Sequence, residues 1–90
     1  MTVNVEVPSI FSRYAGNRHN FAAEGKTVGE TIRFLGKTYP DLEKLILTKD
    51  GRQINSIAIF INGENASPDA TSKPVKDGDH IKVIMLIQGG

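Results

Sequence analysis

Residues 27–40 read TVGETIRFLGKTYP, and this segment has the features of a capped amphipathic helix. Thr27 can accept a hydrogen bond from the first free backbone N–H groups while Glu30 reaches back, which is the spacing of a capping box. Pro40 ends the helix, because its ring clashes with the preceding turn and it lacks an N–H. One apolar stripe, at steps of four, three and four residues, predicts a helix over residues 27–39: Val28, Ile32, Leu35 and Tyr39.

The residues before this helix predict two strands. From Thr2 to Val7 apolar and polar residues alternate, with the three valines on one face, and Pro8 stops the strand. A second strand is expected over Arg18–Glu24, in which His19, Phe21 and Ala23 share a face. The two strands are predicted to form a hairpin, connected by the irregular stretch as a long loop.

The second half of the chain is predicted to be mainly β. One further helical turn around Leu42, Leu45 and Ile46 precedes a tight turn at Asp50-Gly51. Ile57–Ile61 then reads as a strand that turns at Asn62-Gly63. Residues 64–76 look like a loop with little regular structure, and Asp77-Gly78-Asp79 introduces a last strand over His80–Ile87.

This order of elements favours an α+β fold. Two strands, a long amphipathic helix and two more strands suggest one mixed sheet with the helix packed across one face. A β-grasp (ubiquitin-like) fold fits that order, whereas a ferredoxin-like fold would need a second good helix between the last strands. We expect residues 1–90 to form a single domain with a flexible C-terminal tail at residues 88–90.

The faces of the last two strands predict a docking surface. Ile81, Val83, Met85 and Ile87 share one face of the last strand, and Ile84 and Leu86 share the other with His80 and Lys82. Phe60 points away from the face that carries the isoleucines of its strand. If the helix covers one side of the sheet, then an apolar patch lies beside the tail on the open side, and such patches usually mark protein contacts. The predicted partner-binding residues are Phe60, Ile84, Leu86, Ile87 and Gln88.

Composition excludes several classes of function. Eleven basic and ten acidic residues give a net charge of +1, and the basic residues are interleaved with acids, so a nucleic-acid partner is not expected. There is no cysteine, which removes disulfides, thiolate metal sites and cysteine nucleophiles. No signal peptide is evident, and no apolar run approaches the ~20 residues that span a bilayer. We expect a cytoplasmic protein that binds neither membrane nor metal.

The chemistry is expected at Gly89-Gly90. Two glycines can thread into a narrow cleft, and the α-carboxylate that follows them is ionised at neutral pH. A carboxylate becomes a good acyl donor when ATP converts it to an acyl-adenylate, after which sulfur gives a thiocarboxylate or an amine gives an amide. The ATP site must lie on a partner, so the chain is predicted to be a carrier and not an enzyme, with no cofactor and no catalytic residue of its own.

The motifs Ile59-Phe60-Ile61-Asn62-Gly63-Glu64 and Val75–Ile81, followed by Gly89-Gly90, resemble the MoaD/ThiS family of ubiquitin-like sulfur carriers. The length and layout are similar to the longer, CysO-type members. The resemblance implies a β-grasp fold, adenylation by an E1-like adenylyltransferase of the MoeB/ThiF type, a thiocarboxylate on Gly90 and a sulfur-accepting synthase. Many members have Pro and a small residue before the glycines, whereas this chain reads Met85-Leu86-Ile87-Gln88, so the pathway stays open among molybdopterin, thiamin and cysteine biosynthesis.

Other interpretations remain. Asp77 and Asp79 are interpreted as turn residues and not as metal ligands, and His19 and His80 as ordinary surface or boundary histidines. The lysines are interpreted as a solvated face. Two alternative functions use the same fold: a protein modifier similar to the Urm-type proteins, joined to lysines through Gly90, and a plain β-grasp interaction module.

Overall fold

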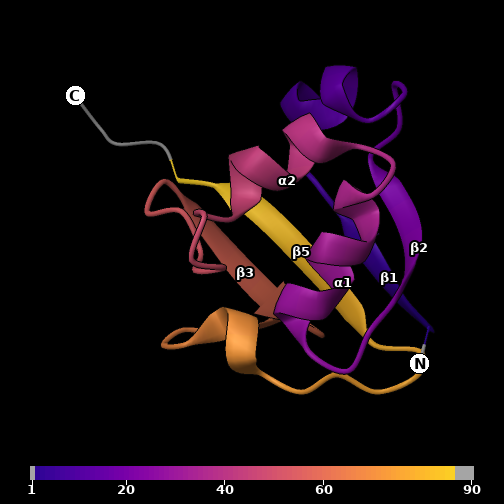
Figure 1. The fold of residues 1–90 in the computed structure, drawn as a ribbon. Helices are drawn as coiled ribbons and strands as arrows, with labels where there is room; N and C mark the ends of the chain where they lie inside the picture. Colours follow the sequence, from indigo (N-terminus) through magenta and orange to yellow (C-terminus); the bar gives the residue numbers. More distant parts are fainter. Residues whose placement is uncertain (1, 87–90) are drawn as a thin grey trace.

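The computed structural model describes residues 2–86 and contains one mixed sheet of five strands (Figure 1). The strands lie in the order β2-β1-β5-β3-β4, so the first and last strands of the chain are neighbours in the middle of the sheet. β1 runs antiparallel to β2 and parallel to β5, while β3 runs antiparallel to both β5 and β4. The strands span Thr2–Glu6, Asn20–Glu24, Ile57–Ile61, Glu64–Asn65 and His80–Met85, from β1 to β5.

The first hairpin confirms the predicted faces of its strands. The three valines of the β1 segment are buried, as are Phe21 and Ala23 of β2. The prediction that His19 shares the face of Phe21 and Ala23 was wrong, because β2 begins at Asn20. The His19 side chain is exposed, as expected of a surface histidine. The backbone N–H of Arg18 is still bonded to the carbonyl of Ala15, 3.1 Å away, so a turn occupies the residues that were expected to begin the strand.

The connection between β1 and β2 contains a 3₁₀-helix, η1, over Ser9–Tyr14, where the sequence predicted irregular structure. Phe11 points from it into the core, while Ile10 and Tyr14 are exposed. The apolar residues of this segment therefore divide between the core and the surface.

The predicted capping box is present at the start of helix α1 (Val28–Gly36). Thr27 Oγ1 accepts the N–H of Glu30 at 3.2 Å, and the Glu30 carboxylate accepts the N–H of Lys26 at 2.9 Å. The reciprocal bond thus reaches one residue further back than the usual box.

The helix ends three residues earlier than predicted. α1 stops at Gly36, and Tyr39 is the N-cap of a second helix, α2, over Pro40–Ile46, which is longer than the one turn expected. Proline is favoured in the first turn of a helix and restricts the residue before it. Tyr39 still packs against the core with the apolar stripe. Its N–H bonds to the Leu35 carbonyl at 2.9 Å, which keeps it one helical turn beyond Leu35.

Gly36 permits the close packing of the two helices. A Cβ atom placed on Gly36 would lie 1.8 Å from Oε1 of Glu43 on α2. A side chain at this position would require Glu43 to move, so the glycine permits the close approach of α2 to the end of α1.

Residues 64–76 are more regular than predicted. They include the short strand β4 and a 3₁₀-helix, η2, over Ala70–Ser72. Two backbone hydrogen bonds tie this segment to the start of α1: Val28 donates to Lys73 at 3.0 Å and Val75 donates to Lys26 at 2.9 Å. The prediction of a loop failed because these contacts are tertiary and leave no local sequence pattern.

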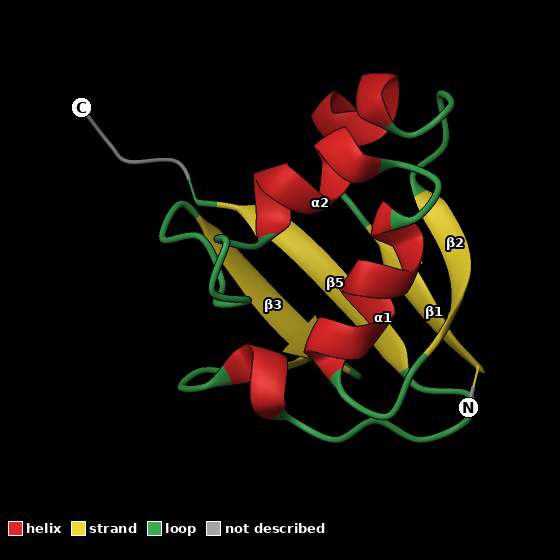
Figure 2. Cartoon of the chain, in the orientation of Figure 1, coloured by secondary structure: helices red, strands yellow, loops and turns green. Residues whose placement is uncertain are grey.

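The helices lie over one face of the sheet and leave the other face uncovered (Figure 2). The core between the layers consists of fully buried aliphatic side chains from the two main helices and from β1, β3 and β5, among them Val3, Val5, Ile32, Leu42, Ile46, Ile59, Ile81 and Val83. This arrangement is the β-grasp fold that the order of elements predicted. Within residues 2–86, no helix is both long and apolar enough to cross a membrane.

The packing of the core can be tested with two isoleucines. Ile59 on β3 is fully buried, whereas Ile10 on η1 is 64% exposed. Ile59→Ala should lower the free energy of unfolding by about 2–5 kcal/mol, because it removes buried methylenes and leaves a cavity. Ile10→Ala, the matched control, should change it by no more than about 0.5 kcal/mol. Urea denaturation measures both, and equal losses would contradict the observed packing.

Candidate functional site

The candidate site lies on the open face of the sheet, and the register of β5 builds it. In the parallel pairing with β1, Lys82 lies opposite Glu6; in the antiparallel pairing with β3, Lys82 lies opposite Phe60 and Ile84 opposite Ala58. Diagonal neighbours on one face of a sheet are within reach of long and aromatic side chains. Phe60 and Ile84 therefore occupy adjacent strands on the same face.

Two of the three described residues that were predicted to bind a partner line a shallow groove of about 470 Å³ on this face. Phe60 and Ile84 are both half-buried there. Leu86 follows on the same side of β5 and is 43% exposed, but it does not line the groove. The complete lining is Glu6, Phe60, Gly63, His80, Lys82 and Ile84.

Three charged or titratable residues of the groove were missed as a group by the sequence analysis. His80 Nε2 lies 3.2 Å from Glu6 Oε1, and Lys82 Nζ lies 4.0 Å from Glu6 Oε2. The alternation of β5 places His80 and Lys82 on the open face, but only the parallel register with β1 brings Glu6 between them. His80 is thus a boundary histidine as expected, with a specific carboxylate neighbour that was not expected.

A hydrogen-bonded turn holds the N-terminal end of β5 beside this groove. Asn62 Nδ2 donates to Asp79 Oδ1 at 3.0 Å, and Asn62 Oδ1 accepts the N–H of His80 at 2.9 Å. The Asn62 amide, together with the N–H of Lys76, holds the pKa of the Asp79 carboxyl below its ordinary value of 3.8. Asn62 and Gly63 both have positive φ, as a type I′ hairpin turn requires.

The acids that flank Gly78 have structural roles. Asp77 Oδ1 accepts the N–H of Thr2 at 2.9 Å, and Asp79 Oδ2 accepts the N–H of Lys76 at 2.8 Å. These contacts confirm the interpretation of Asp77 and Asp79 as turn residues. Within residues 2–86, no group of three or more His, Cys, Asp or Glu side chains is arranged to hold a metal ion.

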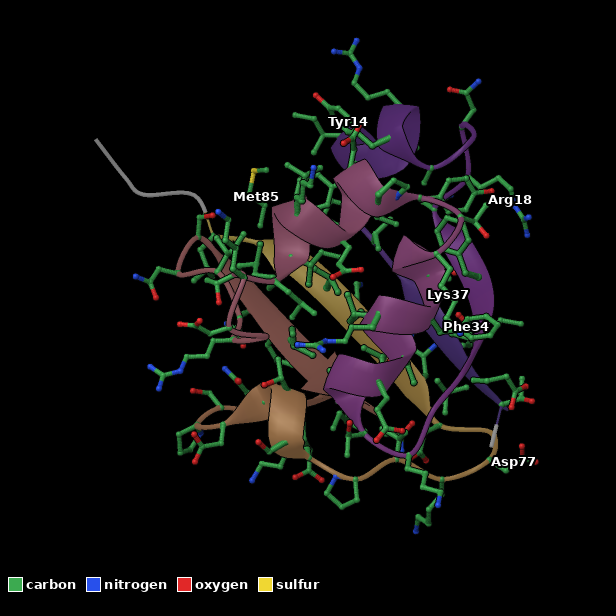
Figure 3. The ribbon with its side chains drawn as sticks, in the orientation of Figure 1. Tyr14, Arg18, Phe34, Lys37, Asp77 and Met85 are labelled. Atoms are coloured by element: carbon green, nitrogen blue, oxygen red, sulfur yellow. The ribbon has the colours of Figure 1, made fainter. Side chains whose placement is uncertain are left out.

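The far end of β5 is fixed to the sheet up to the last described residue. The N–H of Leu86 donates to the carbonyl of Ser56 at 2.7 Å, and Met85 lies opposite Ile57. Met85 is 40% exposed (Figure 3), in contrast to Ile81 and Val83, which were predicted to share its face and are buried. The remaining predicted site residues, Ile87, Gln88, Gly89 and Gly90, and the tail predicted at residues 88–90 lie outside the described residues.

The sequence model of the ThiS family matches residues 5–90. A relative from Archaeoglobus fulgidus named "putative sulfur carrier protein" is 37% identical over 70 residues, which cover 76% of this chain and 78% of the relative.

Two solved structures share the fold over nearly the whole chain. A chain of the Amycolatopsis orientalis BexX/CysO complex has a TM-score of 0.88 at 24% identity, covering 98% of this chain and 99% of that one. The small archaeal modifier protein 1 from Methanosarcina acetivorans has a TM-score of 0.82 at 26% identity, covering 99% and 96%.

The turn beside the groove predicts a dependence of stability on pH. The pKa of Asp79 is lower in the folded state than its ordinary value of 3.8. The ionised Asp79 therefore contributes fully to the stability of the fold above pH 3.8, and this contribution is lost as the pH falls through the pKa of the folded state. Asn62→Gly keeps the positive φ but removes the amide that is the largest single cause of the lowered pKa of Asp79. The variant should therefore be less stable than the wild type at pH about 6, and the difference should shrink at pH about 3.

Urea denaturation at the two pH values measures this difference. Asn17→Gly is the matched control, because Asn17 is an exposed asparagine with φ of 62° in another loop. A difference between Asn62→Gly and the wild type that stays constant with pH would contradict the role given to Asp79.

Proposed function

The chain belongs to the ThiS family, and from this premise we propose that it is a sulfur carrier whose reactive group is the carboxylate of Gly90. The family match runs through Gly90, and this observation carries the proposal. The Leu86–Ser56 hydrogen bond supports it, because the sheet holds the chain firmly up to a point four residues before that carboxylate.

The proposed chemistry begins with activation of Gly90 by a partner. An E1-like adenylyltransferase of the MoeB/ThiF type joins the carboxylate to AMP from ATP and releases pyrophosphate. The terminal sulfur of a persulfide donor then attacks the acyl carbon and AMP leaves. A thiol cleaves the resulting acyl disulfide, which leaves the thiocarboxylate on Gly90 and a disulfide on the donor. This chain is the substrate of these steps, and the ATP is bound by the partner.

The open face of the sheet is the proposed docking surface for that partner. Phe60 and Ile84 offer an apolar groove, and Glu6, His80 and Lys82 surround it with charge of both signs. Leu86, which is exposed at the end of β5, extends this proposed surface, and Ile87 and Gln88, outside the described residues, remain proposed contacts. A partner that covers Phe60 and Ile84 is thereby positioned next to the strand that leads to Gly90.

A sulfur-accepting synthase in the cytoplasm is the second proposed partner. Its substrate is a molybdopterin precursor, a thiazole precursor of thiamin or an activated serine derivative. The similarity to the chain of the BexX/CysO complex lies at 24% identity and concerns the fold, so it does not choose among these acceptors.

Protein modification is a second candidate function. The 26% identity to the small archaeal modifier protein 1, over 99% of this chain, favours it. The same Gly90 acyl-adenylate would then be attacked by a lysine amine, with loss of AMP and formation of an amide. Blots of cell lysate for an N-terminally tagged chain distinguish the two functions, because only modification gives covalent ladders that disappear when Gly90 is deleted.

Sulfur loading can be measured by intact mass spectrometry. We expect incubation with an E1-like adenylyltransferase, ATP, a persulfide donor and a thiol to exchange one oxygen of the chain for sulfur. The change should map to Gly90 and should be absent from a variant that lacks Gly90. Loading of that shortened variant, or no adenylate and no thioacid with several such enzymes, would refute the carrier function.

Docking can be measured through the rate of adenylation. Phe60→Ala and Ile84→Ala should each lower kcat/KM about tenfold, because each truncates an apolar side chain at the centre of the proposed contact. Phe34→Ala is the matched control, since Phe34 is a partly exposed phenylalanine on α1. Circular dichroism establishes that each variant is folded, and an equal effect of all three changes would place the contact elsewhere.

A further inference from the structure

A second surface lies at the edge of the sheet formed by β2, which has a neighbouring strand on one side only. The register shows which backbone groups face outward. Val7 donates to the carbonyl of His19 at 2.9 Å, and two residues further along β2 Phe21 lies opposite Val5. Successive residues of a strand point their backbone N–H and C=O groups to opposite sides of it. Because Phe21 bonds to β1, the N–H and C=O groups of Asn20 and Ala22 point away from β1.

The Asn4 backbone gives an independent check of this direction. Asn4 lies opposite Ala22, and its N–H donates to Asp79 at 2.9 Å, on the β5 side of β1. The outward groups of Asn20 and Ala22 pair with no other described strand. An unpaired strand edge is a template for an additional strand.

An aromatic groove of about 310 Å³ runs between this edge and the C-terminal half of α1. Phe21 forms its floor and packs against Tyr39, with ring centroids 5.6 Å apart. Phe34 forms the helix side and is 37% exposed, and Ala22 forms the strand side. An apolar side chain that enters the groove therefore lies among residues that include Phe21, Phe34 and Tyr39.

Two positively charged side chains, Arg18 and Lys37, flank the groove. Arg18 Cζ lies 5.4 Å from the centroid of the Phe21 ring, and Lys37 Nζ lies 5.8 Å from that of Phe34. No carboxylate of residues 2–86 forms an ion pair with either of them. Arg18 precedes β2 and Lys37 follows α1, and Figure 3 shows both on the β2 side of the molecule. The groove is lined by no acidic residue.

We propose that the β2 edge and this groove bind an extended acidic peptide segment of a partner protein. The segment adds to the sheet as a sixth strand through the backbone groups of Asn20 and Ala22. Its alternate side chains, which are apolar, enter the groove, and its carboxylates lie beside Arg18 and Lys37. Strand addition supplies affinity from the main chain, while the groove and the two cations supply specificity.

This surface is independent of the proposed docking of an activating enzyme. Figure 3 shows Arg18 on the β2 side and Met85, at the end of β5, on the other side of the molecule. β1 and β5 separate the β2 edge from β3, which carries Phe60. A segment bound at β2 leaves the open-face groove free, so both partners can be held together.

The test uses synthetic peptides and the whole chain labelled with ¹⁵N. The probes contain three valines that alternate with threonines and a block of three acidic residues at one end, and a pair of peptides places that block at either terminus. We expect one of them to shift the backbone amide signals of Asn20 and Ala22 in a saturable manner. Its analogue with lysines in place of the acids should bind at least about tenfold more weakly.

Two variants and a control separate the contribution of the strand edge from that of the charges. Arg18→Glu with Lys37→Glu should weaken binding about tenfold or more, whereas Lys44→Glu with Lys49→Glu, which makes the same change in net charge at exposed positions elsewhere, should not. Ala22→Pro should abolish binding, because it removes an outward N–H at an edge where proline is tolerated.

Several results would overturn this inference. One is that the lysine peptide binds as tightly as the acidic peptide. Another is that neither acidic peptide shifts the amide signal of Ala22 in a saturable manner. A third is that the largest shifts occur at Phe60 and Ile84. Concentration-dependent broadening of the Ala22 signal without peptide would also do so, because a second copy would then occupy the edge. The peptide titration contains no activating enzyme and no ATP, so its result does not depend on whether the chain is a sulfur carrier.

Discussion

β1 and β5 run parallel in the middle of the sheet, and this pairing joins the first and last strands of the chain. Asn4 donates to Asp79 and Thr2 accepts from Gly78, each at 2.9 Å. Closing a loop of this length costs conformational entropy, and burial of Val5 and Ile81 between sheet and helices offsets that cost. Because β5 is paired on both sides, it cannot leave without opening the sheet at its centre. The chain that continues from Leu86 therefore starts from a fixed point.

The same pairing gives the open face its chemistry. Helices cover one side of the sheet, and alternation along β5 sends Ile81 and Val83 into that core while His80, Lys82 and Ile84 go to the other side. The parallel register then places the Glu6 carboxylate within 4.0 Å of both His80 Nε2 and Lys82 Nζ. An apolar groove with charged side chains of both signs suits the proposed partner, which must bind, react and be released, because exposed charges contribute orientation more than affinity. The β5 register, more than any single side chain, therefore defines the proposed docking face.

Much of this structure was predictable from local patterns, and most of the rest depends on contacts between distant residues. The alternating valines of β1, the Thr27–Glu30 cap and the direction of Phe60 follow from short-range periodicity, which the structure confirms. The early end of α1 was missed because Pro40 was predicted to end the first helix, whereas it begins a second helix for which Tyr39 is the N-cap. The neighbours of Glu6 were missed for a different reason: they lie more than seventy residues away and are set by strand register. The regular structure in residues 64–76 likewise depends on backbone bonds to Lys26 and Val28.

The two surfaces have different consequences because of where they lie on the sheet. In the proposed carrier function, a partner on the open face would compete with every other enzyme that must reach Gly90. A partner bound at the β2 edge is two strands away from β5 and does not compete. Holding the chain there raises the effective concentration of its terminus near that partner without new contacts at the reacting group. A small fold with a single reactive end can in this way serve successive enzymes, provided that one contact persists while the others exchange. In this sheet the exposed edge of β2 is the place where such a contact leaves the open face and the end of β5 unobstructed.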